Sequence, residues 1–385
     1  MIPLKYNIRS LRIRWVTTLL TCVAIGVVVF ASVLTFGMIG GIEHALSASG
    51  DEADVIVMRK GANDEMSSTI TATSAKELTN LEGIAVGPDG TPLASREFVT
   101  IALKPRRNEG GTTNVIVRGL DQVGRLTRPD FKIVEGRDIK PGVNEVITSR
   151  SIARRFENLG LGEKFDINNV DFTVVGYFEA GGSSAESEVW TDLRDLTSAQ
   201  RFEGAVSVVQ IRTKDDTSRA EIIKRIQEND QFKLKAIGET EYFENQKSSA
   251  IAIKIVAYII AGFLTVGAMF AAANTMYAAV SNRGREIGTL RAVGFPRRSI
   301  LTSFMLESLV LCSLGGILGC LATIPLNGLA GGTSIGFSEI TFAFRFGTGV
   351  LVQGMILAIA MGLLGGLFPA LRAIRLQITD ALRQR

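Results

Sequence analysis

The chain has 385 residues, 46% of them hydrophobic and 21% charged, and its mean hydropathy is +0.25. A positive mean hydropathy argues against a wholly soluble protein and predicts membrane spans. The formal net charge of +4 does not indicate a nucleic-acid partner, because the arginines cluster beside apolar runs rather than along one face. The single histidine, His44, excludes a multi-histidine metal site. The cysteines all lie inside apolar stretches, which excludes a secreted disulfide framework: Cys22, Cys312 and Cys320.

The first predicted element is a cytoplasmic amphipathic helix over residues 1–14. Leu4 and Ile8 share one helical face, and Lys5 and Arg9 lie on the other. A basic amphipathic helix suits the inner surface of a membrane, where it would contact lipid. The alternative is a simple positively charged anchor for the span that follows.

Four apolar runs are long enough to cross a bilayer, which takes ~20 residues in a helix. These transmembrane helices are predicted over residues 15–42, 249–281, 299–327 and 346–371. The first run follows basic residues, as the core of a signal peptide does, but such a core has only ~7–15 apolar residues. We therefore interpret it as a retained helix. The predicted fold class is an α-helical membrane protein with four transmembrane helices and an inserted domain.

The inserted domain, residues 43–248, has the pattern of a mixed α/β fold. Runs rich in Val, Ile and Phe predict strands over 54–58, 98–103, 114–118, 172–178 and 206–211. Helical patterns cover 74–81, 149–159 and 217–229. Ser74 and Glu77 fit a capping box at the first of these helices.

No catalytic constellation is found in this domain. It has no second histidine to pair with a serine, and it has no cysteine. We interpret Glu186 and Glu188, beside Trp190, as part of a solvated loop rather than an acid/base pair. The domain is expected to bind or to transmit motion, and the chain is not expected to be an enzyme.

The arginines predict the orientation in the membrane, because cytoplasmic segments of membrane proteins are enriched in Lys and Arg. Basic residues precede the first span and recur in the segment 282–298 and in the tail 372–385. The charged residues of the loop 328–345 are Glu339 and Arg345 alone. Both termini and the segment 282–298 are therefore expected in the cytoplasm, and the large domain and the loop 328–345 outside it.

Small residues recur at four-residue spacing in the predicted spans, which favours close helix packing in lipid. The pairs are Gly37 with Gly41, Gly315 with Gly319, and Gly362 with Gly366. Packing within one subunit and packing between two subunits both fit this pattern. Glu307 is the one charge in the third run, and it is expected to face protein because a carboxylate in lipid costs ~2.5 kcal/mol or more.

The segment 282–298 predicts a short charged helix between the second and third spans. Arg283, Glu286 and Leu290 recur at helical spacing, and Gly294 with Pro296 ends the helix. A helix held between two spans can transmit motion from a cytoplasmic partner. The alternative is a solvated basic loop that serves only topology. The residues predicted to couple to a partner are Arg283, Arg285, Glu286, Ile287, Gly288, Arg291 and Gly294.

The sequence contains no Gly-x-x-x-x-Gly-Lys-[Ser/Thr] loop for nucleotide phosphates. Any ATP-driven work is therefore expected to be powered by a separate chain.

These motifs together resemble the MacB/FtsX/LolC-type ABC transporter permeases, the mechanotransmission (type VII) family. The resemblance covers essentially the whole chain. In the coupling segment and the spans it rests on Asn274, Val280, Arg283, Glu286, Ile287, Gly288, Arg291, Gly294, Leu306, Glu307, Gly315, Gly319, Gly365, Gly366, Pro369 and Asp380. In the large domain it rests on the stretches 144–146, 172–176 and 187–190, which are similar to the MacB branch.

The resemblance implies a permease subunit in the bacterial inner membrane with a periplasmic domain. It implies two separate ATPase subunits that bind ATP and Mg, a second permease subunit, most simply a homodimer, and no cofactor on this chain. By analogy, the periplasmic domain divides into a porter-like part at 50–104 plus 203–247 and an inserted part at 105–202. The sequence departs from MacB in having no fused ATPase domain, which places it with split systems.

Three functions stay open at this point. The leading one is export or extraction of a hydrophobic or amphipathic substrate from the periplasmic side, including lipid or lipoprotein transport, with a periplasmic adaptor and an outer-membrane channel as optional partners. The second is an FtsX-like signalling subunit that activates a cell-wall hydrolase without moving cargo. The third is a membrane scaffold with no ATPase.

Overall fold

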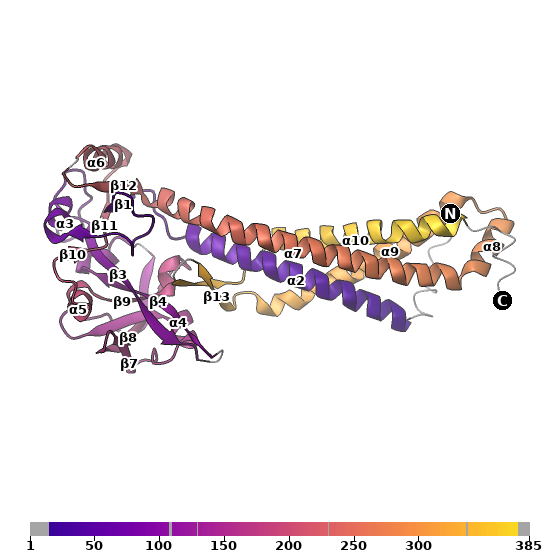
Figure 1. The fold of residues 1–385 in the computed structure, drawn as a ribbon, viewed down its shortest axis with the longest axis horizontal. Coiled ribbons are helices and arrows are strands. Elements are labelled where there is room, and N and C mark those ends of the chain that lie inside the picture. Colours follow the sequence, from indigo (N-terminus) through magenta and orange to yellow (C-terminus); the bar gives the residue numbers. More distant parts are fainter. Residues whose placement is uncertain (1–14, 108–109, 129, 230, 336–337, 376–385) are drawn as a thin grey trace. The chain divides into compact units, whose positions relative to one another are not determined.

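The computed structural model describes residues 15–107, 110–128, 130–229, 231–335 and 338–375. Figure 1 shows the chain as a group of long helices and an α/β portion. The described residues divide into two compact units. The helical unit comprises the described parts of Met1–Gly40, Ala252–Leu329 and Phe344–Arg385, and the α/β unit comprises those of Gly41–Ile251 and Ala330–Ala343. The amphipathic helix predicted over 1–14 and most of the tail 372–385 lie outside the described residues.

Four described helices are long and apolar enough to cross a membrane. They are α2 (Trp15–Ser47), α7 (Glu239–Asn282), α9 (Arg297–Thr323) and α10 (Thr348–Arg375). Three of them are longer than the predicted apolar runs: α2 continues to Ser47, α7 begins at Glu239 and α10 continues to Arg375. The residues at the start of α7, Glu239–Lys247, are mostly polar, so hydropathy marks only the apolar part of a helix that the backbone continues.

Glycines bring these helices close together inside the helical unit. Side chains added to Gly315 and Gly319 of α9 would collide with backbone atoms of Cys22 and Gly26 on α2. Glycines on α10 have the same role against α9 and α7: Gly362 meets Leu309 and Cys312, Gly365 meets Met269 and Ala272, and Gly366 meets Ser308. The Ser308 hydroxyl also donates to the Gly362 carbonyl at 2.8 Å. The small-residue spacing at these four positions of the motif therefore serves packing within one subunit.

Replacing Gly319 by valine is expected to destabilise the helical unit. A Cβ at this position would lie 2.6 Å from the carbonyl oxygen of Gly26 and 2.9 Å from the Cβ of Val29. Overpacking of this kind typically costs about 1–3 kcal/mol. The measurement is thermal unfolding of the purified chain in detergent, with Gly262→Val as the matched control, because nothing lies within 4 Å of a Cβ built on Gly262. Equal unfolding temperatures for the two variants would contradict the packing role of Gly319.

The α/β unit contains a ten-stranded sheet within the described residues, in the order β12-β1-β11-β3-β4-β9-β6-β8-β5 with β7 paired to β8. Its strands are β1 (Asp54–Arg59), β3 (Ala94–Pro105), β4 (Thr112–Leu120), β5 (Phe131–Gly136), β6 (Glu145–Ser149), β7 (Lys164–Ile167), β8 (Val170–Ala180), β9 (Glu188–Asp192), β11 (Val208–Arg212) and β12 (Leu234–Gly238). A smaller pair joins β2 (Ile70–Thr71) to β10 (Ala205–Val206). The runs predicted as strands all coincide with strands of these sheets.

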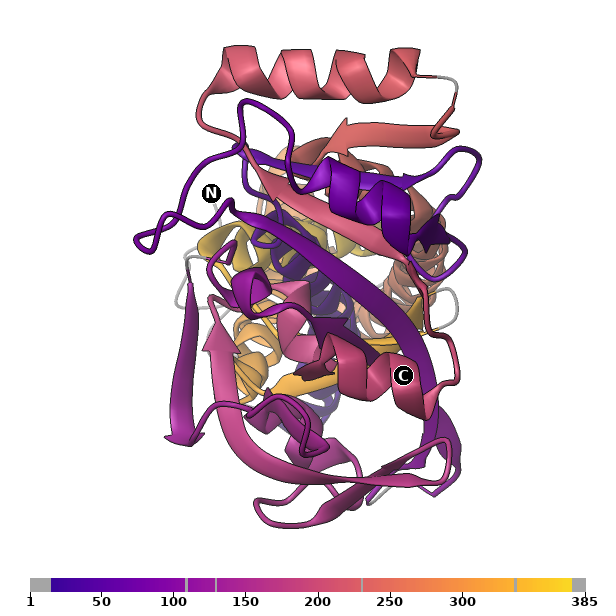
Figure 2. The same ribbon diagram turned by 90° about the vertical axis from the view of Figure 1, so that its left-hand side faces the viewer.

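Four helices cover one face of the large sheet, and α3 and α5 are seen in front of it in Figure 2. They are α3 (Ala72–Leu78), α4 (Arg150–Arg155), α5 (Leu193–Ala199) and α6 (Asp216–Glu228). Alternation along β1 sends Val55 and Val57 into the core under these helices and Ile56 and Met58 to the opposite face. That opposite face meets Tyr242 of α7 and the 3₁₀ turns η1 (Gln122–Arg125) and η2 (Ser184–Ser187).

Side chains at the ends of preceding strands cap three of these helices. Thr71 accepts from the Ser74 backbone N–H, Ser149 from Ile152, and Asp192 from Arg194. The capping box predicted at Ser74 is therefore wrong, because β2 leads directly into α3 and places Thr71 at the N-cap.

Two further features bear on the sequence prediction. The sheet is continuous across the division predicted at 104/105, where β3 pairs with β4, and the strands of the two predicted parts are grouped on either side of it: β12, β1, β11 and β3 in the porter-like part, and β4, β9, β6, β8 and β5 in the inserted part. The loop predicted over 328–345 contains a second hairpin, β13 (Ala330–Ile335) with β14 (Ser338–Ala343), preceded by the turn η3 (Ile324–Leu326).

Candidate functional site

The short helix α8 (Gly284–Ala292) joins α7 to α9 and is the first candidate site. The chain turns at Arg283, where helical hydrogen bonding from α7 ends, and α8 follows at once. At its other end Gly294 adopts a φ of +103°, a conformation that glycine tolerates, and Phe295 N–H bonds back to the Leu290 carbonyl. Gly294 therefore ends the helix, and Pro296 caps the start of α9.

One side of α8 is anchored to the long helices. The Arg283 guanidinium donates to the Glu307 carboxylate of α9 at 2.9 Å, and it lies over the Phe304 ring. Both charged side chains are buried, at 8% and 7% exposed. Ile287, at 2% exposed, belongs to an apolar cluster with residues of α7, α9 and α10. Glu307 therefore faces protein through its contact with Arg283.

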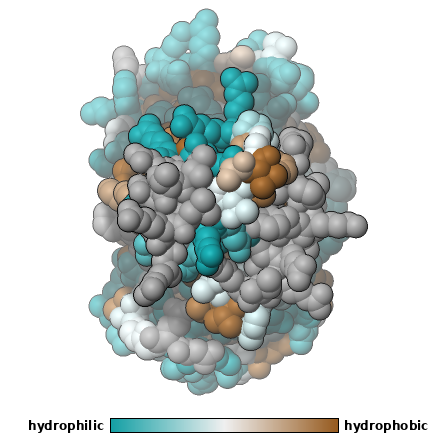
Figure 3. Space-filling model, turned by 90° about the vertical axis from the view of Figure 1, so that its right-hand side faces the viewer, coloured by the Kyte–Doolittle hydropathy of each residue, from teal (hydrophilic) through white to brown (hydrophobic). Residues whose placement is uncertain are grey.

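The other side of α8 is exposed and charged. Arg285 and Glu286 are exposed, and the Glu286 side chain keeps 57% of its surface in solvent while lying 3.4 Å from Arg283. Val293, just after the helix, is 74% exposed. Figure 3 shows the end of the helical unit at which α8 lies, with hydrophilic side chains grouped beside a few hydrophobic ones.

The structure thus separates the residues predicted to couple to a partner. Arg283, Ile287 and Gly288 are buried within the chain, so they hold α8 in place and do not present a contact surface. Arg285 and Glu286 form the exposed surface, and Arg291 is half-buried at its edge. Helical spacing alone could not distinguish the two sides, because both carry arginine.

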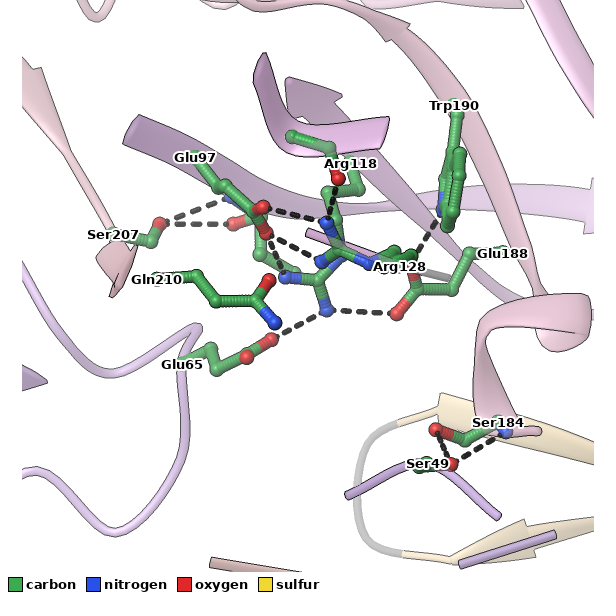
Figure 4. Close-up of polar contacts among 12 residues, drawn as sticks. Ser49, Glu65, Glu97, Arg118, Arg128, Ser184, Glu188, Trp190, Ser207 and Gln210 are labelled. Atoms are coloured by element: carbon green, nitrogen blue, oxygen red, sulfur yellow. Dashed lines mark hydrogen bonds and ion pairs between the residues drawn. The ribbon is translucent and has the colours of Figure 1, made fainter. Parts of the chain in front are cut away.

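The second candidate site is a buried charge network in the α/β unit, shown in Figure 4. We use this name for Glu65, Glu97, Arg118, Arg128 and Glu188. Arg118 on β4 donates to Glu188 at 2.7 Å, to Glu97 at 2.8 Å and to Glu65 at 2.6 Å. Arg128 bonds Glu97 as well, at 2.9 Å and 3.0 Å. One guanidinium therefore holds three carboxylates from β3, β9 and the loop after β1.

The carboxylates of this network have different surroundings. Burial raises the pKa of Glu97, but the charges of Arg128 and Arg118 outweigh burial and leave that pKa below its ordinary value. Burial dominates at Glu65, whose pKa is raised despite the contact with Arg118. The Trp190 indole N–H also donates to Glu188, at 2.7 Å, and so gives that carboxylate a second hydrogen-bond partner besides Arg118.

The charge network was not predicted from the sequence. The interpretation of Glu188 as solvated is wrong, because Glu188 is 6% exposed and lies on a central strand. Glu186 also has a structural role, since it accepts from the backbone N–H groups of Ala180 and Gly182. The available signal was the alternation in Glu188–Asp192, a strand pattern that places Glu188 and Trp190 on one face.

A cavity of about 660 Å³ lies beside the charge network, on the sheet face that the helices α3 to α6 leave open. Its apolar lining consists mainly of Met58, Met66, Val99, Ile116, Ile237, Tyr242 and Phe243. Its polar lining is as extensive: Asn63, Asp64, Glu65, Arg118, Ser184, Ser187, Glu188, Lys235, Asn245 and Gln246. The cavity therefore has an apolar side and a polar, charged side. Among the described residues, no group of three His, Cys, Asp or Glu side chains could hold a metal ion.

Four candidate membrane spans, a short charged helix between two of them and an inserted α/β unit define a multi-pass permease-type membrane protein. Two family descriptions match this arrangement. The MacB-like periplasmic core domain matches residues 18–229, and the FtsX-like permease C-terminal region matches residues 258–378. The chain belongs to the MacB/FtsX-type family of ABC transporter permeases.

Curated relatives agree with this assignment. The chain is 23% identical to the macrolide export ATP-binding/permease protein MacB of Acinetobacter baylyi, over 85% of this chain and 54% of that protein. It is 26% identical to the MacB of Rhodospirillum rubrum, over 98% of this chain and 60% of that protein. The chain thus spans about half the length of the curated relatives it matches. The crystal structure of the periplasmic region of MacB from Actinobacillus actinomycetemcomitans aligns with 54% of this chain and 97% of its own, at 12% identity and a TM-score of 0.39.

Proposed function

We propose that this chain is the permease subunit of an ABC transporter in which a separate ATPase moves α8, and that this motion reaches the α/β unit. The single observation that carries the proposal is the two-sided helix α8. Its buried side is fixed to α9 by Arg283 and Glu307, and its opposite side presents Arg285 and Glu286 to solvent. A partner that pushes on the exposed side would displace α9 with it.

A separate ATPase is part of this proposal because the resemblance to the MacB/FtsX-type permeases implies one; the 385 residues themselves contain no phosphate-binding loop. ATP and Mg would be bound by that partner. In the proposed assembly two permease subunits meet two ATPase subunits in the bacterial inner membrane. The α8 side lies in the cytoplasm, as the arginines predict, and the α/β unit lies in the periplasm. Membrane lipid surrounds the spans, and a periplasmic adaptor remains an optional partner.

We further propose that the transported substrate is hydrophobic or amphipathic and is handled by the α/β unit. The cavity of about 660 Å³ supports this, because it places an apolar wall, with Met58, Ile237 and Phe243, beside polar groups that include Arg118 and Lys235. Curated relatives carry the name macrolide export protein, which is consistent with an amphipathic substrate. An FtsX-like subunit that signals to a cell-wall hydrolase would need no such cavity.

The ATPase contact is tested by charge substitutions on the exposed side of α8. Arg285→Glu and Glu286→Lys are expected to weaken binding of the ATPase at least tenfold, which is about 1.4 kcal/mol, and to reduce substrate-coupled ATP hydrolysis accordingly. The ATPase is first identified as a chain with a phosphate-binding loop that co-purifies with the permease. Binding and turnover are then measured with both proteins in liposomes.

Two controls separate docking from other effects. Glu286→Gln removes the charge without placing a cation beside Arg283, so it reports whether the lysine variant acts only through local repulsion. Glu221→Lys makes the same charge change at an exposed position of α6 in the α/β unit and is expected to bind the ATPase normally. If Arg285→Glu and Glu286→Lys both retain full binding and turnover, the segment serves only topology and the coupling proposal is wrong.

A further inference from the structure

The chain enters and leaves the large sheet of the α/β unit at one place. The segment after α2 and the first residues of α7 meet there: the Asp51 backbone N–H donates to the Glu239 carboxylate at 2.9 Å. A Cβ built on Gly50 would lie 3.0 Å from the Cα of Thr240, so the two backbones are in close contact. Glu239 is the first residue of α7 and is buried, at 7% exposed.

Carboxylates outnumber cations at this contact. We use the name acidic joint for Asp51, Asp54, Gln210, Arg212 and Glu239. Gln210 donates to Glu239 at 3.0 Å, and Arg212 donates to Asp54 at 2.8 Å and also pairs with Asp51. The acidic joint therefore places three carboxyl groups around one guanidinium. The charged groups that act on Glu239 from more distant elements are Arg128, which follows η1, and Glu97 of β3.

Burial and the neighbouring acid disfavour the ionised form of Glu239. Burial, followed by the charge of Asp54, raises the pKa of Glu239 to about 8. Burial likewise raises the pKa of Asp54 to about 6, although Arg212 opposes the shift. At neutral pH the Glu239 carboxyl is therefore neutral while it stays inside the acidic joint. In that form it still accepts the hydrogen bonds from Asp51 and Gln210.

We propose that Glu239 is a proton-dependent latch that holds the start of α7 to the segment after α2, and that opening the latch releases one proton. Inside the joint the neutral carboxyl bridges Asp51 and Gln210. Once ionised, it would be a buried anion beside Asp54 and Asp51, with Arg212 already engaged by both. Moving Glu239 into water removes this cost, so ionisation and opening are coupled.

The latch goes beyond the proposed transport function, because it makes the connection between the two helices depend on the pH outside the cell membrane. Both α2 and α7 are candidate spans. With the latch closed, their ends at the acidic joint move together; with the latch open, they can separate. Alkaline conditions would favour the open form.

The direction of the pH effect on the latch, and the pH range in which it occurs, follow from the pKa values of Glu239 in the open and closed forms. An open, solvated Glu239 has the ordinary pKa of about 4.3, whereas the closed one has a pKa of about 8. The closed latch is therefore fully favoured below the ordinary pKa. The equilibrium constant for closing the latch falls as pH rises toward 8, by up to about tenfold per pH unit. Above pH 8 it is constant. Titration of Asp54 adds to this pH dependence only below about pH 6.

Hydrogen exchange of the peptide 48–54 in the full chain, followed by mass spectrometry, tests the latch. After correction for the intrinsic pH dependence of exchange, protection of this peptide is expected to fall about 15-fold between pH 6.5 and 8. Glu239→Gln preserves an acceptor for Asp51 N–H and cannot ionise, so its protection is expected to stay constant over this range. Glu241→Gln, an exposed position on the same helical turn, is the matched control and is expected to behave as the unmodified chain.

A second variant tests the neighbouring charge. Asp54→Asn removes the carboxylate that acts on Glu239, so the fall between pH 6.5 and 8 is expected to be smaller. Constant protection in the unmodified chain, the same fall in Glu239→Gln, or the full fall in Asp54→Asn would each overturn the proposal. The measurement needs no ATPase, so its failure would leave the proposed transport function standing, and failure of the α8 variants would leave the latch standing.

Discussion

Replacing Arg118 by methionine is expected to lower the free energy of unfolding of the α/β unit by about 3–5 kcal/mol, the range for breaking a buried ion pair from one side. Arg118 is 7% exposed and donates to Glu65, Glu97 and Glu188. Methionine fills a similar volume but leaves these carboxylates buried. Glu97 keeps its hydrogen bonds to a second cation, Arg128. The charge network would thus hold three carboxylates against one guanidinium.

Trp190 provides the measurement, because its indole contacts Glu188 inside the network. In a Trp15→Phe background it is the single tryptophan of the chain, and its fluorescence follows denaturant unfolding of the α/β unit in detergent. Arg96→Met is the matched control, since the Arg96–Asp121 pair is partly exposed and such pairs contribute about 0–1 kcal/mol. A loss for Arg118→Met no larger than that of the control would contradict the role of the network.

The pH dependence of this variant gives a second check. Without Arg118, burying ionised Glu65, whose pKa burial already raises, is costly, whereas burying its neutral form costs much less. The deficit of Arg118→Met relative to the unmodified chain is therefore expected to shrink as pH falls from 7 toward 4. A double variant with Glu188→Gln is expected to recover part of the loss, because the two sites are in contact and their effects are not additive.

Replacing Glu307 by alanine is the second change with a large expected effect. It removes the buried carboxylate that pairs with Arg283 beside Phe304, and Glu286, 3.4 Å away and 57% exposed, is a weaker partner. We expect a loss of about 3 kcal/mol in stability. We also expect ATP hydrolysis to become uncoupled from transport, since α8 would lose its polar anchor to α9. Thermal unfolding in detergent and coupled turnover in liposomes measure the two effects.

A charge swap distinguishes the ion pair from a general packing defect. Arg283→Glu combined with Glu307→Arg restores opposite charges at the same two positions, so it is expected to recover more stability than either single change retains. Glu307→Gln keeps the shape of the side chain and isolates the contribution of charge. If Glu307→Ala unfolds and couples as the unmodified chain does, Arg283 does not anchor α8 and the transmission path proposed here fails.

The membrane spans and the strands β1, β3, β4, β8 and β11 could be predicted from the sequence because their signals are local, whereas β5, β6, β7, β9 and β12 were not among the predicted runs. Twenty consecutive apolar residues or an alternating run of Val, Ile and Phe is visible in a short window, as in residues 346–371 or 172–178. The position of the short helix α8 could also be predicted from local signals, because Gly294 and Pro296 end the helix by their backbone preferences.

The functional assignments within those elements depended on contacts between distant residues. Arg283 and Arg285 are two positions apart in the chain and are the same residue type. Arg283 is nevertheless buried against Glu307, whereas Arg285 is exposed. Glu188 follows a turn-like sequence but lies 2.7 Å from Arg118, seventy positions earlier in the chain. No short window contains both partners, so charge in the sequence does not reveal whether it is solvated or paired.

By itself, then, the sequence determined the class of fold, the four apolar spans and the short helix between two of them, because apolar length, alternation and helix-ending residues act over a few neighbours. The tertiary structure alone decided which glycines pack within the subunit, which side of α8 is exposed, and that Arg118 and Glu239 sit in buried clusters of carboxylates. The burial of Arg118 and Glu239 arises when β1, β3, β4, β9, β11 and α7 come together. Burial and the charges of distant residues then set both the ion pairs and the pKa of Glu239.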